Sequence, residues 1–352
     1  MDELDAIAAR IVDRDRGGAR GPWTLEVYPT LRCNLDCAFC DTTDRHRPAQ
    51  GELAAAEWLR IVDEAAAMGA RRLCVLGGGE PLIAASTPAI LRRAKEHGME
   101  GVLTTNGTLL NGGMRRLLVE IGWDEVHVSI DGADPATHDA LRGQPGAFRK
   151  SISALCALRV ARGTGATPRL ALHTVLTNRN WFQLVEIVQL AHAMGAFRLD
   201  VDALVAYRPE QRRLALSPGE AAALPAVARA ALHEAERLGL ASTLARFLDG
   251  DTLRRGERLP IPGTGAGYAA APCLKAWHHL VVQADGRTSP CCVLAGEGES
   301  VAATAVAEVW ERGATLTAIR TGMLAGRPTG RCAECSENIL AHERAIRARL
   351  PA

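Results

Sequence analysis

Short apolar runs alternate with longer amphipathic stretches between residues 23 and 240. An apolar run of about four to eight residues is typical of a strand buried in a parallel sheet, and apolar positions at helical spacing indicate a helix. Strands that alternate with helices in this way predict an α/β domain whose parallel sheet is covered by helices. The predicted strands are 23–28, 71–77, 100–105, 124–131, 169–177 and 197–204, and the predicted helices are 52–69, 86–97, 108–121, 147–162, 180–194 and 217–239.

The segments on either side of this domain have different patterns. Leu4, Ile7 and Ile11 are spaced as on one face of a helix, which is expected to cap the main domain. Glycine and proline are frequent just before Cys273, which is typical of a linker. Beyond it, Asp285-Gly286 follows an apolar run and predicts a hairpin turn. The predicted organisation is an N-terminal helical segment (1–22), a main domain (23–240), a linker (241–272) and a small second domain with a C-terminal helix (273–352).

Three cysteines follow the first predicted strand at the spacing C-x3-C-x2-C, namely Cys33, Cys37 and Cys40. Thiolate sulfur is a soft ligand suited to iron–sulfur clusters or zinc. Because a closed zinc site or an ordinary cubane takes four ligands, three on one loop predict a [4Fe–4S] cluster with one iron open to a non-protein ligand. The alternatives are a chance spacing, or a zinc knuckle completed by a ligand from elsewhere.

The same loop, with Phe39 between its last two cysteines, resembles that of the radical S-adenosylmethionine (radical SAM) enzymes. The resemblance implies that the open iron binds the amino and carboxylate groups of SAM. The reduced cluster then cleaves SAM to a 5′-deoxyadenosyl radical that abstracts hydrogen. It also implies a partial (β/α)6 barrel, with its site at the C-terminal ends of the strands, and a reductant of the flavodoxin or ferredoxin type.

The ends of the next strands carry residues for which the resemblance implies contacts with SAM. The second strand ends in Gly77-Gly78-Gly79-Glu80, where glycines permit close approach and a carboxylate can accept from an ammonium group. A tight turn without a ligand is the alternative for the glycines, and turn or cap roles are the alternative for Asn106 and Asp131. By this resemblance Gly78, Gly79 and Glu80 bind the amino group of SAM, Ser129 with Asp131 nearby contacts the ribose, and Arg142 lies near the carboxylate. Phe39 and Asn106 are further expected cofactor contacts.

Charged residues alternate with apolar ones along the sixth predicted strand, where Arg198, Asp200 and Asp202 share one face. Because helices cover the outer face of such a sheet, these side chains and His173 on the fifth strand are expected to face the barrel lumen. An unpaired buried charge is costly, so the set either pairs internally or meets a polar ligand. The first option is a network of Arg198 with Asp200 or Asp202. In the second, Asp200, Asp202, Arg198 and His173 hold a small polar substrate.

A second set of cysteines lies in the second domain, at C-x12-G-x4-C followed by C-x2-C. It resembles the SPASM and Twitch extensions of radical SAM enzymes, which implies an auxiliary [4Fe–4S] cluster without an open iron. Because no cysteine follows the last of the set, the one-cluster Twitch form, as in 2-deoxy-scyllo-inosamine dehydrogenases, is the closer match. A structural zinc is the alternative. The implied ligands are Cys273, Cys291, Cys332 and Cys335.

Three further cysteines remain. Cys74 and Cys156 are predicted to be buried fillers on a strand and a helix. Cys292, beside a predicted ligand, is interpreted as a spare thiol, a competing ligand or a hydrogen-atom donor.

Composition narrows the classes of partner. Forty-one Lys and Arg against 40 Asp and Glu, without a basic run, disfavour nucleic acid and anionic membranes. The N-terminus has no apolar signal region and no stretch approaches the ~20 apolar residues of a membrane span, so a cytoplasmic location is expected. There, ten cysteines indicate metal binding rather than disulfides.

The expected function follows from the resemblance. It implies an oxidoreductase of natural-product (antibiotic) biosynthesis that oxidises a secondary alcohol on a sugar, aminocyclitol or nucleoside, with the auxiliary cluster accepting the electron. The alternatives are redox-neutral decarboxylation or epimerisation of such a substrate, and maturation of a ribosomal peptide. A cluster protein for electron transfer or regulation belongs to a different class and would need neither the glycine turn nor the ribose contacts.

Overall fold

The computed structural model describes residues 2–15, 21–40, 49–206, 208–249, 268, 271–328, 330–335 and 337–350. Its centre is a nine-stranded sheet that is not closed, in the order β7-β6-β5-β4-β3-β2-β1-β8-β9. Strands β1 to β6 run parallel and lie within three residues of the predicted bounds, which confirms the partial α/β barrel. They are β1 Thr24–Val27, β2 Arg72–Val75, β3 Glu100–Thr105, β4 Glu125–Ser129, β5 Arg169–Leu176 and β6 Arg198–Ala203.

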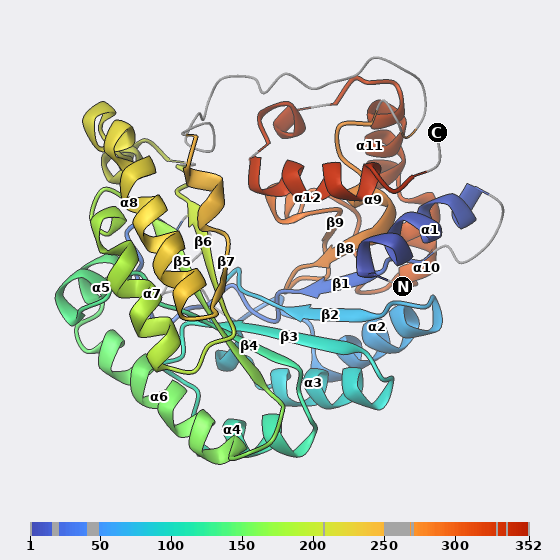
Figure 1. The fold of residues 1–352 in the computed structure, drawn as a ribbon. Coiled ribbons are helices and arrows are strands. Elements are labelled where there is room, and N and C mark those ends of the chain that lie inside the picture. Colours follow the sequence, from blue (N-terminus) through green and yellow to red (C-terminus); the bar gives the residue numbers. More distant parts are fainter. Residues whose placement is uncertain are drawn as a thin grey trace.

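Helices surround the outer side of this sheet (Figure 1). Leu199 and Val201 of β6 are fully buried in the main core, whereas the charged residues between them are only partly buried. The alternation along β6 therefore separates a helix-covered face from a polar lumen. The covering helices are α2 Ala55–Ala67, α3 Thr87–Glu96, α4 Gly112–Glu120, α5 Pro135–Arg142, α6 Ala147–Arg162, α7 Leu184–Ala193 and α8 Pro218–Arg237.

Helix α5 was not expected from the apolar pattern. The Asp134 side chain caps its first turn by accepting from the N–H of Thr137, and Pro135 occupies its first position. The helix ends at Gly143, whose φ of 64° is the left-handed conformation that glycine adopts most readily. The sequence signal for this helix was therefore its capping residues, Asp134 and Pro135 at the start and Gly143 at the end.

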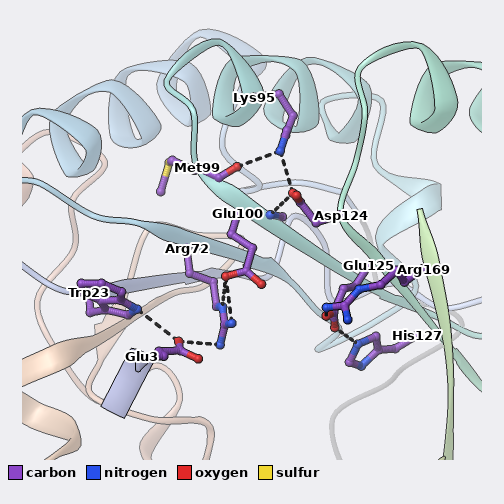
Figure 2. Close-up of polar contacts among 11 residues, drawn as sticks. Glu3, Trp23, Arg72, Lys95, Met99, Glu100, Asp124, Glu125, His127 and Arg169 are labelled. Carbon is purple, nitrogen blue, oxygen red and sulfur yellow. Dashed lines mark hydrogen bonds and ion pairs between the residues drawn. The ribbon is translucent and has the colours of Figure 1, made fainter. Parts of the chain in front are cut away.

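The N-terminal helix α1, Glu3–Asp15, reaches the end of the barrel opposite the predicted site. Figure 2 shows Glu3 between Trp23 and Arg72, with Arg72 also paired to Glu100. Arg72 and Glu100 are the first residues of their strands. Because this is the N-terminal end of the parallel strands, α1 contributes to the floor of the barrel.

The second domain joins the barrel sheet directly. Its strand β8, His279–Val282, pairs in parallel with β1, and the N–H of Tyr28 donates to the carbonyl of Val282 at 2.9 Å. The predicted hairpin is present, since β8 pairs antiparallel with β9, Thr288–Ser289, around Gly286 at φ 83°. Around it lie the helices α9 Lys275–His278, α10 Val306–Arg312, α11 Ala314–Leu324 and α12 Glu337–Arg347.

The barrel sheet continues into residues assigned to the linker. Strand β7, Ala241–Ser242, pairs with β6, and Leu244 and Phe247 after it are buried in the main core. Most of the remaining predicted linker, residues 250–267, lies outside the described residues. None of the helices within the described ranges is long and apolar enough to cross a membrane.

Candidate active site

The three-cysteine loop follows β1 and is held by the end of α5. The N–H of Ala38 donates to the carbonyl of Leu141 at 2.8 Å, and the N–H of Asp36 donates to the carbonyl of Arg142 at 3.2 Å. The last carbonyls of a helix have no partner within it, so they are free to accept from another segment. A β-carbon on Gly143 would overlap the carbonyl oxygen of Asp36. Helix α5, which the sequence analysis did not predict, therefore holds the cysteine loop through the carbonyl groups at its C-terminal end.

The glycine turn after β2 packs on the opposite side of the loop. The N–H of Glu80 donates to the carbonyl of Arg32 at 2.9 Å. A β-carbon on Gly79 would overlap that same carbonyl, and one on Gly78 would overlap the side chain of Leu31. The close approach of the cysteine loop therefore requires glycine at position 79, where the clash is with backbone, whereas at position 78 it is with a side chain that can rotate. The predicted contact of both glycines with SAM stays a prediction.

Glu80 and Asn106 connect this turn to the end of β3. The carboxylate of Glu80 is 2% exposed and accepts from Thr105 Oγ1 at 2.7 Å and from the N–H of Asn106 at 2.8 Å. Burial raises the pKa of Glu80, and these hydrogen bonds oppose the rise. The side chain of Asn106 donates to Asn34 inside the cysteine loop at 3.0 Å. The two residues therefore hold the loop, and their predicted contacts with SAM stay predictions.

A buried ion pair lies beneath the loop. Nε of Arg142 is 2.5 Å from Oδ2 of Asp131, which is fully buried, and Nη1 of Arg142 donates to Cys37 Sγ at 3.7 Å. The guanidinium group also lies over the ring of Phe39, 5.4 Å from its centroid. Burial disfavours the charge of Arg142, but Asp131 and Cys37 outweigh it and raise its pKa. Arg142 thus supplies a fixed positive charge next to a sulfur that must lose its proton to bind metal.

The positive charge of Arg142 favours the thiolate form of Cys37. Burial raises the pKa of its thiol to about 11, and Arg142 opposes the rise, while Cys40 and Cys33 add to it. The three thiols therefore lie within electrostatic reach of one another. The predicted roles of Asp131 at the ribose and of Arg142 at the SAM carboxylate stay predictions, because here the two residues bind each other.

Replacing Arg142 by methionine is expected to lower the free energy of unfolding by about 3–5 kcal/mol, because the buried Asp131 carboxylate loses its partner. Urea unfolding of the cluster-free chain measures this. Adding Asp131→Asn should recover much of the loss, since an amide oxygen can still accept from the N–H of Val175, as Asp131 does at 2.8 Å. Equal losses in the single and double variants would contradict the assignment.

The predicted substrate residues face the lumen and are paired with one another. Arg198 Nε lies 2.9 Å from Asp200, which is the internal pairing considered from the sequence. His173 Nε2 lies 2.8 Å from Asp202, which Arg246 also contacts at 3.3 Å. Burial opposes protonation of His173, but Asp202 outweighs it and raises its pKa. The Asp202 side chain is 38% exposed, so a ligand can still reach it.

Ser129 is available for a ligand. It lies at the end of β4 in register with His173, and its hydroxyl makes no hydrogen bond to another described residue. The predicted contact with ribose is therefore open to it.

The second set of cysteines comes from three segments. Cys273 precedes α9, Cys291 follows β9, and Cys332 and Cys335 lie at the turn Gly330–Glu334 and just beyond it. Burial raises the pKa of Cys332 to about 12, and Cys291 and Cys335 add to the rise. Burial also raises the pKa of Cys273, with a contribution from Cys291. Cys291 thus lies within electrostatic reach of Cys273 and Cys332, and Cys335 lies within reach of Cys332.

One of the other three cysteines contradicts its prediction. Cys156 is exposed on α6 and does not fill the core. Helix α6 turns this position outward, since its buried residues include Leu155 and Leu158 instead. Cys74 is partly buried and in register with Glu26 on the lumen side of β2. Cys292 is exposed.

Both sets fit iron–sulfur clusters by the chemistry of their donors. Each consists of thiols alone, three on one loop and four in the second domain, where Cys273, Cys291 and Cys332 belong to a buried apolar core. No group of three or more His, Cys, Asp or Glu side chains within the described residues already converges as a site for one metal ion. The fit is therefore one of ligand type.

Comparison with known proteins supports both domains. Residues 27–191 match the model of the radical SAM superfamily, and residues 273–336 match the SPASM model of an iron–sulfur cluster-binding domain. The AdoMet-dependent heme synthase of Methanosarcina barkeri is 27% identical over 301 residues, 83% of this chain and 82% of the relative. The PqqA peptide cyclase of Granulibacter bethesdensis is 32% identical over 180 residues, 51% of this chain and 46% of the relative.

The fold has solved counterparts. The crystal structure of Streptococcus suis SuiB bound to S-adenosylmethionine superimposes with a TM-score of 0.68 at 18% identity, covering 89% of this chain and 71% of SuiB. Together the two domains imply a SAM-binding [4Fe–4S] cluster, SAM itself and an auxiliary iron–sulfur cluster, as the sequence predicted. The chain therefore carries a radical SAM domain followed by an iron–sulfur cluster-binding SPASM domain.

Proposed function

We propose that this enzyme oxidises a peptide substrate by abstracting hydrogen within the barrel lumen and passing one electron to the second domain. The observation that carries the oxidative part is the continuous sheet. Strand β1 leads into the three-cysteine loop, and its neighbour β8 belongs to the domain that holds the other four cysteines. When bound, SAM and the first cluster supply a hydrogen-abstracting group, and the second cluster supplies a one-electron acceptor.

The residues of the chain have separate tasks in this proposal. Cys33, Cys37 and Cys40 hold the first cluster, and Arg142 stabilises the Cys37 thiolate. The glycine turn fixes the loop, and Glu80 has one lone pair left on Oε2 for the SAM ammonium, beyond the hydrogen bond it accepts from Asn106. The remaining ligands and contacts are Cys273, Cys291, Cys332 and Cys335 for the second cluster, and Gly78, Gly79, Asn106, Ser129 and Asp131 around SAM.

The lumen residues on β5 and β6 hold the substrate. Asp202 and Arg198 are each more than a third exposed despite their ion pairs, so they can exchange those partners for groups of a ligand. His173 in its protonated form donates hydrogen bonds and suits a peptide carbonyl or carboxylate, and Asp200 suits an amide N–H. A peptide presents both kinds of group along its backbone.

The relatives favour a peptide over the sugar, aminocyclitol or nucleoside expected from the sequence. The peptide cyclase and a mycofactocin maturase of Mycobacterium tuberculosis, 30% identical over 187 residues, are named for peptide or maturation chemistry. SuiB has also been solved bound to its precursor peptide SuiA. The resemblance to 2-deoxy-scyllo-inosamine dehydrogenases has no support among these relatives.

A tetrapyrrole is the second candidate substrate. The heme synthases of Methanosarcina barkeri and Nitratidesulfovibrio vulgaris match 83% and 90% of this chain, more than the peptide cyclase does. The lumen cations Arg198, Arg246 and His173 would suit the carboxylates of such a substrate.

One experiment separates the substrates. The anaerobically reconstituted enzyme is incubated with SAM, a flavodoxin-type reductant and either a precursor peptide encoded near the gene, Fe-coproporphyrin III or an aminocyclitol. We expect the peptide alone to stimulate formation of 5′-deoxyadenosine and to lose two hydrogens, with deuterium passing from labelled peptide into 5′-deoxyadenosine. Stimulation by the tetrapyrrole or the aminocyclitol instead would overturn the peptide assignment.

Cys332→Ala is expected to retain part of the SAM cleavage but to lose most product formation, because the second cluster loses a ligand while the first keeps all of its own. Parallel assays of 5′-deoxyadenosine and product measure this. Cys156→Ala, at an exposed position on α6, is the matched control and should behave as wild type. Undiminished product from Cys332→Ala would show that the second domain does not accept the electron.

A further inference from the structure

A chain of three buried polar side chains crosses the seam between the two domains. The hydroxyl of Tyr28 donates to Oε1 of Glu26 at 2.8 Å, and Nε2 of His279 lies 3.0 Å from Oε2 of the same carboxylate. Tyr28, Glu26 and His279 are 6%, 7% and 7% exposed. Glu26 belongs to β1, Tyr28 follows it directly, and His279 begins β8, so the chain spans the point where the second domain joins the barrel.

The Tyr28 end of this chain lies near both the glycine turn and the cysteines after β9. The ring of Tyr28 lies beside the glycine turn, since a β-carbon on Gly78 would be 3.4 Å from its Cδ2. Burial raises the pKa of Tyr28, and after Glu26 the thiols of Cys292 and Cys291 add to that rise. Tyr28 therefore lies between the turn that holds the cysteine loop and the two cysteines after β9, of which Cys291 belongs to the second set.

Glu26 is ionised and His279 is neutral near pH 7, so the pair can accept one more proton. Burial opposes ionisation of Glu26, but His279 and then Lys275 outweigh it and lower its pKa. Burial and then Lys275 lower the pKa of His279 to about 4, so the imidazole is neutral near pH 7. The charged or titratable groups that face the pair are Tyr28 just after β1, Cys74 from β2, Lys275 and His278 from α9, and Cys291 and Cys292 after β9.

An added negative charge nearby changes this balance. In the low dielectric of a buried seam, it raises the proton affinity of a neutral imidazole and of a carboxylate alike. An electron arriving at the second cysteine set is such a charge. A proton that binds to the pair compensates this added negative charge, so no mobile counter-ion has to do so.

We propose that Glu26 and His279 take up one proton when the auxiliary cluster accepts one electron. This rests on the proposed function of that cluster as electron acceptor. In turnover, the bound cluster would accept the electron of the substrate radical, the proton that the radical loses passes to water, and the pair takes up one proton from water. Together with the initial hydrogen abstraction this makes a two-electron oxidation. In a titration, dithionite supplies the electron and water supplies the proton. The pair thereby acts as the proton acceptor that accompanies the electron acceptor.

The midpoint potential of the auxiliary cluster tests this directly. The full-length reconstituted enzyme is titrated with dithionite, followed by electron paramagnetic resonance, between pH 6 and pH 9. We expect the potential to fall by up to about 59 mV for each tenfold decrease in proton concentration. Glu26→Gln and His279→Gln should each flatten this dependence, with iron content and SAM cleavage reporting whether each variant is folded and loaded.

Glu125→Gln is the matched control. Glu125 forms a similar pair with His127, at 2.8 Å on β4, and β3, β2 and β1 separate it from β8 in the sheet (Figure 2). This variant should keep the pH dependence of wild type. A wild-type potential that does not change with pH, or a slope that survives both Glu26→Gln and His279→Gln, would overturn the inference alone. Wild-type enzyme that binds only about half the expected iron and shows no second signal would overturn the proposed function with it.

Discussion

Replacing any one of Cys33, Cys37 and Cys40 by alanine is expected to abolish SAM cleavage and to remove about half of the bound iron. A cubane with only two protein ligands lacks the anchorage that leaves a single iron open for SAM. Iron analysis and anaerobic assay of 5′-deoxyadenosine measure the two losses. The second cysteine set is intact in these variants, so its signal should persist and show that the chain has folded.

The control for these variants is again Cys156→Ala, which removes a thiol that contacts neither set. Its iron content and SAM cleavage should equal those of wild type. If any variant of the loop still cleaves SAM at a substantial rate, that cysteine is not a ligand and the site must be completed by another residue.

Gly79→Ala is expected to abolish SAM binding while the barrel remains folded. The added β-carbon would overlap the backbone carbonyl of Arg32, which cannot rotate away as a side chain could. The cysteine loop must therefore shift, and forced backbone shifts of this kind cost about 1–3 kcal/mol. The spectroscopic response of the reconstituted first cluster to added SAM measures binding, and circular dichroism reports on the fold.

Gly219→Ala provides the comparison, because a β-carbon at Gly219 on α8 would meet no atom within 4 Å. It should bind SAM as wild type does. A Gly79→Ala enzyme with unchanged affinity for SAM would show that the loop can move without loss, and would contradict the packing described for this turn.

The strands were predictable because their apolar residues must be buried wherever the chain folds. Leu25 and Val27 on β1, like Leu199 and Val201 on β6, have no exposed surface, and their spacing alone identified both strands. Helix α5 was missed because it is short and its role is to hold a loop rather than to bury a long apolar face. Its Asp134 and Gly143 were visible in the sequence, but such residues also end ordinary turns.

The candidate site likewise has one part that could be predicted from the sequence and one part that could not. The spacing of Cys33, Cys37 and Cys40 is local, and a soft ligand set on one loop has few other uses. The contacts that hold the loop join residues far apart in the chain, such as Arg142 with Cys37 and Asn106 with Asn34. Nothing in either local sequence specifies such a partner.

The sequence alone therefore determined the class of the fold, the spacing of the cysteines in the two candidate sets and the alternation of charged residues along β6. Each of these depends on neighbours a few positions away, through the periodicity of a strand or the reach of a loop. Only the tertiary structure decided that β8 lies against β1, that Asp131 neutralises Arg142, and that Glu26 meets His279 across the seam of two domains. These pairings depend on how distant segments pack, since burial forces each charge to find whichever partner the fold brings near.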